Sequence, residues 1–221
     1  SHNGFANIEI MNNYLQFDFE FTDELKLYNS FLRNKKISTK IEGNIKRNPN
    51  LYLNLNFDIT RLNLNDIRKK LLNQKQFLKK NYKFIKKING KFNISFKDQF
   101  SGSLSLENGE IYFNEFILKY GKYNLEFDGF LSNIDKQKKI NFTLVNSFEY
   151  KKKPINIFLE GVLNTSIKTI TFKKIIINNN IVSKKNLRSH ELKFKNINRD
   201  GNVLKMLNYK VVEEYFDSFV D

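Results

Sequence analysis

The chain contains no cysteine, few histidines and no long apolar run. The lack of cysteine excludes disulfides and thiolate metal sites but leaves the compartment open. The two histidines, His2 and His190, are far apart and do not form the closely spaced pair that a zinc site uses. Because no stretch of about 18 apolar residues occurs, these residues contain no transmembrane helix. We therefore expect no metal and no cofactor.

Catalytic motifs are missing as well. The sequence has no glycine-rich phosphate loop and no nucleophile elbow. Carboxylates such as Asp58, Asp66, Asp98 and Asp128 stand near turns or strand ends, where aspartate is common for structural reasons. No pattern pairs two of them as general acid and base. We expect no catalytic residue and no enzymatic activity.

The formal net charge of +15 comes almost entirely from lysine, with 32 Lys against 6 Arg. Asparagine, isoleucine and phenylalanine are also abundant, a composition that AT-rich codons produce. Specific recognition of bases favours the bidentate fork of arginine, so we expect no specific nucleic-acid partner. A basic surface also suits anionic lipid headgroups, and a nonspecific polyanion binder remains an alternative.

Alternation of apolar and polar residues recurs along most of the chain and predicts β-strands. It is clearest over 51–59, 92–96 and 123–127. Apolar side chains of such strands project from one face, while Asn, Lys, Asp and Ser project from the other. This is typical of an antiparallel sheet with one wetted face. We predict a mainly β fold: a long, curved antiparallel sheet, open like a groove or half-barrel, with one or two helices.

Two segments show helical spacing of their apolar residues instead. We expect a lysine-rich helical insertion at about residues 65–87 and a C-terminal helix over 201–221. The basic helix is a candidate for contact with a membrane surface. Residues 1–200 would otherwise form one curved β domain. Because strand-like sequence begins almost at once, at Ala6, we expect the chain to be a fragment with further protein upstream.

A short motif with a central glycine occurs four times, in the form apolar, polar, Gly, any residue, apolar. Its glycines are Gly43, Gly90, Gly129 and Gly161. Glycine inside a strand marks a bulge, a bend or a close backbone approach. The recurrence indicates that one β unit is used several times.

The strand and turn Phe57–Ile67 is followed by an insertion and then by the glycine-containing strand Ile88–Ile94. Leu106–Ile111 and Tyr123–Leu131 form a further succession of strand, glycine turn and strand. These segments resemble the AsmA-like family of bacterial bridge-like lipid transfer proteins, and the resemblance covers roughly residues 40–165. It implies a periplasmic β-sheet, anchored in the inner membrane by a segment absent here, whose apolar groove carries phospholipid tails toward the outer membrane.

Under this resemblance the alternating apolar residues would bind the acyl chains of a phospholipid or another lipid. The predicted lipid-binding residues are Leu53, Leu55, Phe57, Phe92, Ile94, Phe96, Tyr123, Leu125, Phe127, Ile155, Ile157 and Leu159. Rim lysines such as Lys69, Lys70, Lys79 and Lys80 would hold the headgroups. The alternative is a closed structural or envelope-assembly β domain that buries the same residues on itself and takes no ligand.

Overall fold

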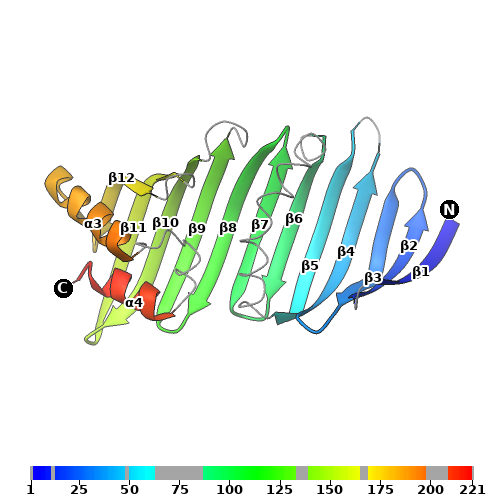
Figure 1. The fold of residues 1–221 in the computed structure, drawn as a ribbon, viewed down its shortest axis with the longest axis horizontal. Helices are drawn as coiled ribbons and strands as arrows, with labels where there is room; N and C mark the ends of the chain where they lie inside the picture. The colour runs from blue at the N-terminus through cyan, green and yellow to red at the C-terminus, as the bar shows by residue number, and fades with distance from the viewer. Residues whose placement is uncertain are drawn as a thin grey trace. The chain divides into compact units, whose positions relative to one another are not determined.

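The computed structural model describes residues 2–10, 13–47, 50–62, 87–132, 139–164, 169–197 and 209–220. These residues form one open, mainly antiparallel sheet in which thirteen strands follow one another in chain order, with β1 and β13 at the edges (Figure 1). The strands are β1 (His2–Ile10), β2 (Asn13–Phe21), β3 (Leu25–Arg33), β4 (Ile37–Lys46), β5 (Tyr52–Leu62), β6 (Asn89–Phe96), β7 (Phe100–Glu107), β8 (Glu110–Tyr120), β9 (Tyr123–Ser132), β10 (Lys139–Tyr150), β11 (Lys153–Asn164), β12 (Thr169–Ile177) and β13 (Asn180–Ile181). The predicted fold class, a mainly β protein with an open sheet, is confirmed.

One neighbouring pair, β5 and β6, is parallel. A parallel pair cannot be joined by a hairpin, so β5 and β6 need a longer connection than the other neighbouring strands. The residues between Leu62 and Asn89 make that connection. The predicted basic helix at 65–87 falls in this connection and, apart from Lys87, lies outside the described residues, as do the four rim lysines.

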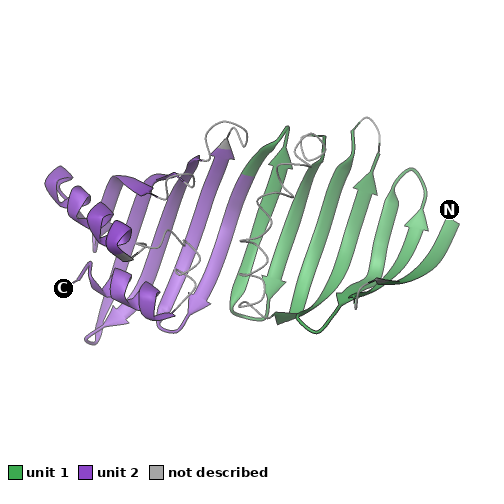
Figure 2. Ribbon diagram, viewed as in Figure 1, with its two compact units in different colours: residues 1–111 green, residues 112–221 purple. Residues whose placement is uncertain are grey.

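The chain divides into two compact units, residues 1–111 and 112–221 (Figure 2). Unit 1 holds β1 to β7. Unit 2 holds β8 from Tyr112 onward, β9 to β13 and two helices, α3 (Lys184–Ile197) and α4 (Tyr209–Asp217). Helix α4 lies within the predicted C-terminal helix 201–221, of which residues 201–208 are outside the described part.

Helix α3 was not expected, because its sequence is polar over most of its length. It places Leu187 and Phe194 on one face, where both are buried, and it packs against β12. Helix α4 buries Val212, Tyr215 and Phe216. Together the helices cover the apolar face of unit 2 and form with it the main hydrophobic core.

Burial therefore differs sharply between the two units. Among the described residues of unit 1, Ile41 is the only large apolar side chain that is buried, at 8% exposed. The other buried apolar side chains all belong to unit 2, where Ile157 and Ile175 are fully enclosed. One unit has a covered core, whereas the described part of the other has an apolar face without a covering layer.

Candidate functional site

The candidate site is the apolar face of unit 1, defined by the side chains of β1 to β7 that lie in register on one side of the sheet. Residues directly opposite each other in neighbouring strands project to the same side. One row crosses all seven strands and consists of Gly4, Phe19, Leu27, Gly43, Leu55, Phe92 and Leu104. A second row beside it includes Leu25, Ile45, Leu53, Gly90 and Leu106. The pairings thus join the apolar residues of separate strands into a continuous surface.

Six of the predicted lipid-binding residues come together at the parallel pair. Leu55 lies opposite Phe92, and Phe57 lies opposite Ile94. The rings of Phe57 and Phe92 stack with centroids 6.5 Å apart. Leu53 and Phe96 extend the same two strands, and all six side chains are half-buried. Sequence periodicity identified these residues, and the parallel register places them side by side.

The opposite face of the same strands is polar and exposed. Asn93 donates a hydrogen bond to the side-chain oxygen of Asn56 over 2.7 Å, and Ser95 donates to Asp58 over 3.2 Å. Asn93 and Ser95 follow Phe92 and Ile94 directly in the chain, but their side chains project to the other side of the sheet. The two faces of β5 and β6 therefore differ in chemistry at these positions, as the alternation predicts.

The glycines of the repeated motif all stand at positions whose paired residues in the neighbouring strands point to the apolar faces. A side chain at Gly43, whose φ is +145°, would place its Cβ atom 2.0 Å from the carbonyl oxygen of Asn54. A Cβ atom at Gly90 would lie 2.4 Å from the carbonyl oxygen of Leu53. In unit 2, the register between β11 and β12 shifts at Gly161, which marks a bulge. The predicted close approach and bulge are both found.

The remaining predicted lipid-binding residues lie in unit 2, where the structure encloses most of them. Tyr123, Leu125, Ile155, Ile157 and Leu159 are all at most 8% exposed and belong to the core beneath α3 and α4. Phe127 is half-buried against that core and stacks on Phe142. The same alternation that leaves a face accessible in unit 1 supplies a closed core in unit 2.

A polar cluster holds α4 on the sheet of unit 2. Lys122 contacts both carboxylate oxygens of Asp217 at 3.0 Å, and the Tyr123 hydroxyl donates to the same carboxylate over 2.8 Å. The Lys122 ammonium also lies over the rings of Tyr123, Phe148 and Tyr150. Burial, followed by the hydrogen bond and the charge of Asp217, raises the pKa of Tyr123 above its ordinary range. Sequence analysis missed this cluster, because its members are 94 and 95 residues apart.

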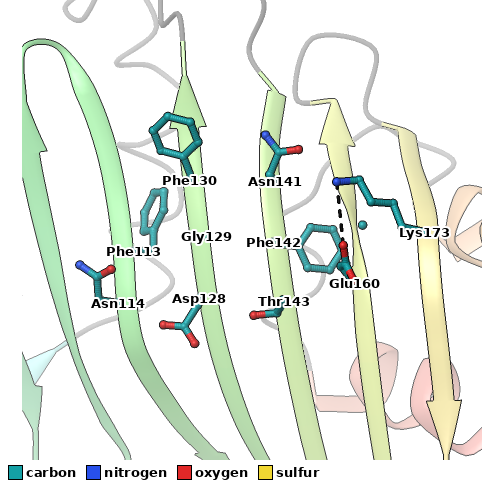
Figure 3. A pocket seen from close by; sticks show the side chains of 11 residues that line it. Phe113, Asn114, Asp128, Gly129, Phe130, Asn141, Phe142, Thr143, Glu160 and Lys173 are labelled. Carbon is teal, nitrogen blue, oxygen red and sulfur yellow. Dashed lines mark ion pairs between the residues drawn. The ribbon is translucent and has the colours of Figure 1, made fainter.

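A shallow depression of about 300 Å³ lies within unit 2, over β8 to β12 (Figure 3). Its polar lining includes Asp128, Thr143 and Glu160, which lie opposite one another on three adjacent strands. Asp128 accepts the backbone N–H of Glu115 over 2.7 Å, and Glu160 pairs with Lys173 at 4.0 Å. Each of the two carboxylates therefore has a partner within the described residues.

Comparison with known proteins yields no match to any family model, to any curated protein or to any solved structure. In the described ranges, no three His, Asp or Glu side chains are grouped so that they could hold a metal ion. None of the helices described here has both the length and the apolar character needed to cross a membrane.

Proposed function

We propose that this chain is a lipid-binding and transfer module in which the apolar face of unit 1 shields acyl chains from water. The observation that carries the proposal is the continuous apolar row across seven strands, over which no element packs in the described part of unit 1. A contiguous apolar surface whose side chains stay partly accessible to solvent is a candidate interaction site. The periplasmic setting and the inner-membrane anchor rest on the AsmA-like resemblance and are part of the proposal.

The dimensions of the row suit an acyl chain. Neighbouring strands are about 4.8 Å apart, so seven strands extend over roughly 29 Å. The hydrocarbon core of a bilayer, which holds two acyl chains end to end, is about 30 Å thick. One chain would therefore cross three or four strands, contacting Leu55, Phe92 and Leu104 if it followed the row from β4 to β7. Each buried CH₂ group would contribute about 0.8 kcal/mol.

The chemistry of the row also suits a mobile lipid. Its residues are Leu, Phe and Gly, and none of them has a side-chain group that could hydrogen-bond a ligand and hold it at one place. Glycine at Gly4 and Gly43 interrupts the bulky side chains. Transfer in this model is diffusion of an acyl chain along an apolar surface, and no covalent step occurs.

The test introduces the same charge at two neighbouring positions that lie on opposite faces of the sheet. Leu55→Asp places a charge on the apolar face, whereas Asn56→Asp places the same charge one residue further on the exposed face. Native mass spectrometry with lipid extraction, followed by uptake of a fluorescent phospholipid, would measure binding. We expect bound lipid in the wild-type chain and in Asn56→Asp, and its loss in a folded Leu55→Asp variant. A second pair, Phe92→Asp and Lys91→Asp, repeats the comparison on β6.

A closed structural or envelope-assembly β domain is the competing proposal, and the covered core of unit 2 favours it. A monodisperse, lipid-free chain that takes up no fluorescent phospholipid would refute the lipid proposal and support the closed domain. Equal binding by both members of each matched pair would place the lipid away from the apolar face of unit 1.

A further inference from the structure

The helices that cover unit 2 bury several polar groups for which the described residues offer no hydrogen-bond partner. The side chain of Asn146 is 0% exposed, and neither its amide nitrogen nor its amide oxygen is bonded. The Tyr215 hydroxyl of α4 and Nδ1 of His190 on α3 are also buried without a partner. These are four of the six such atoms in the described part of the chain, and all four lie in or against the core that α3 and α4 close.

Asn146 stands on the apolar face of unit 2. It lies directly opposite Leu125 on β9 and Ile157 on β11, and both of these residues belong to the core beneath α3 and α4. Side chains opposite one another project to the same side of a sheet, so the amide points to the covered side. A buried polar group without a partner loses its hydration and gains no bond in exchange. The unpaired amide therefore lowers the stability of the state in which the helices cover the sheet.

Helix α4 has little stability of its own. It contains nine residues, and isolated helices of fewer than about 12 residues are marginal in water. Its last turn holds no basic residue and ends at Asp217, so a negative charge lies at the negative end of the helix dipole. The helix is held by burial of its apolar side chains and by the contact of Asp217 with Lys122. Release from the sheet would therefore melt α4 and hydrate the Tyr215 hydroxyl and the Asn146 amide together.

We propose that α4 is a releasable cover and that the face beneath it is a second surface for a phospholipid acyl chain, an assignment that rests on the function proposed above. The strand residues under the helices repeat the apolar alternation of unit 1 and include Leu125, Ile155, Ile157 and Leu159. An acyl chain that takes the place of α4 keeps these side chains away from water. The amide of Asn146 then donates to an ester oxygen of the lipid, a partner that it lacks among the described residues when the cover is closed.

Removing the unpaired amide should hold the cover more tightly. Asn146→Leu replaces it with an apolar side chain of similar size, and Asn156→Leu makes the same change at an exposed position of β11 as the matched control. Hydrogen exchange at the amides of α4 measures release of the helix. We expect this exchange to slow by about tenfold to a hundredfold in Asn146→Leu, the factor that an unpaired buried group costs, and to stay unchanged in Asn156→Leu. Tyr215→Phe removes the unpaired hydroxyl from α4 itself and should slow the exchange as well.

A soluble lipid gives the second readout. Dihexanoyl phosphatidylcholine, added below the concentration at which it forms micelles, should speed exchange in α4 of the wild-type chain, because lipid on the uncovered face favours release. The acceleration should be smaller in Asn146→Leu, which holds the cover closed and offers the lipid no amide. Leu55→Asp alters only the face of unit 1 and should keep the full acceleration.

Two results would overturn the proposal. One is exchange in α4 that does not respond to the phospholipid, even where native mass spectrometry shows lipid bound to the chain, a result that leaves the function of unit 1 intact. The other is exchange that is unchanged or faster in both Asn146→Leu and Tyr215→Phe, because the buried polar groups would then not promote release. If Leu55→Asp keeps all of its bound lipid and α4 still responds, the second surface stands and the proposal for unit 1 fails. If Asn146→Leu does not fold, as judged by circular dichroism, Tyr215→Phe and the lipid response decide.

Discussion

Removing the Asp217 carboxylate tests whether the polar cluster on α4 acts as one unit. In the wild-type chain this carboxylate receives the Tyr123 hydroxyl and pairs with Lys122. The Tyr123 side chain is only 1% exposed, so water cannot replace a lost partner. Asp217→Ala would leave that hydroxyl unpaired, at a cost of about 2 kcal/mol. Loss of the partly exposed ion pair adds about 1 kcal/mol, which gives about 3 kcal/mol in total.

The partner substitution should cost less. Tyr123→Phe removes a hydrogen bond to a charged group, worth about 1.5 kcal/mol, and leaves Asp217 paired with Lys122. The double variant no longer contains an unpaired hydroxyl. It should therefore lose about 2.5 kcal/mol, roughly 2 kcal/mol less than the sum of the two single losses. Glu213→Ala is the control, because Glu213 lies 3.8 Å from Lys122 and is 40% exposed, and we expect a change below about 0.5 kcal/mol.

Urea unfolding followed by far-UV circular dichroism would give the free energies of unfolding, since the chain has no tryptophan to report by fluorescence. Hydrogen exchange would show whether the loss of protection is concentrated in α4. If the free energy lost in the double variant equalled the sum of the two single losses, the two contacts would be independent of each other and the reasoning would be refuted. A cost of Asp217→Ala equal to that of Glu213→Ala would show that the carboxylate does not hold the helix.

Two further predictions concern backbone geometry and pH. Gly43→Ala should destabilise the chain by about 3 kcal/mol, because the added Cβ atom meets the Asn54 carbonyl oxygen at a positive φ; an effect below about 1 kcal/mol in urea unfolding would contradict this. Burial, and then the charge of Lys193, lower the pKa of His190, whose ring stacks on Phe219 at 4.2 Å. The folded chain therefore binds fewer protons than the unfolded chain, so stability should be fully present above pH 6.5 and fall as the pH drops below it. His190→Gln should flatten a plot of melting temperature against pH over that range, and an unchanged slope would assign the effect to another group.

The accessible face and the closed core could not be distinguished from sequence, although both were anticipated as apolar strands. Leu55 on β5 and Ile157 on β11 stand in equivalent alternating patterns, yet the first is half-buried and the second is fully enclosed. The difference arises from α3 and α4, which follow the last strand and pack back over unit 2. The polar sequence of α3 gave no sign that Leu187 and Phe194 would cover a sheet.

Local sequence determined which residues form strands and which side each side chain takes, because a strand alternates its side chains whatever its neighbours are. It also located the glycines where the backbone approaches closely, since few other residues tolerate the φ of Gly43. Only the tertiary structure decided which strands are neighbours, that β5 and β6 run parallel, and which apolar face the helices cover. These choices depend on contacts between residues far apart in the chain, such as Tyr123 and Asp217, and no local pattern encodes such contacts.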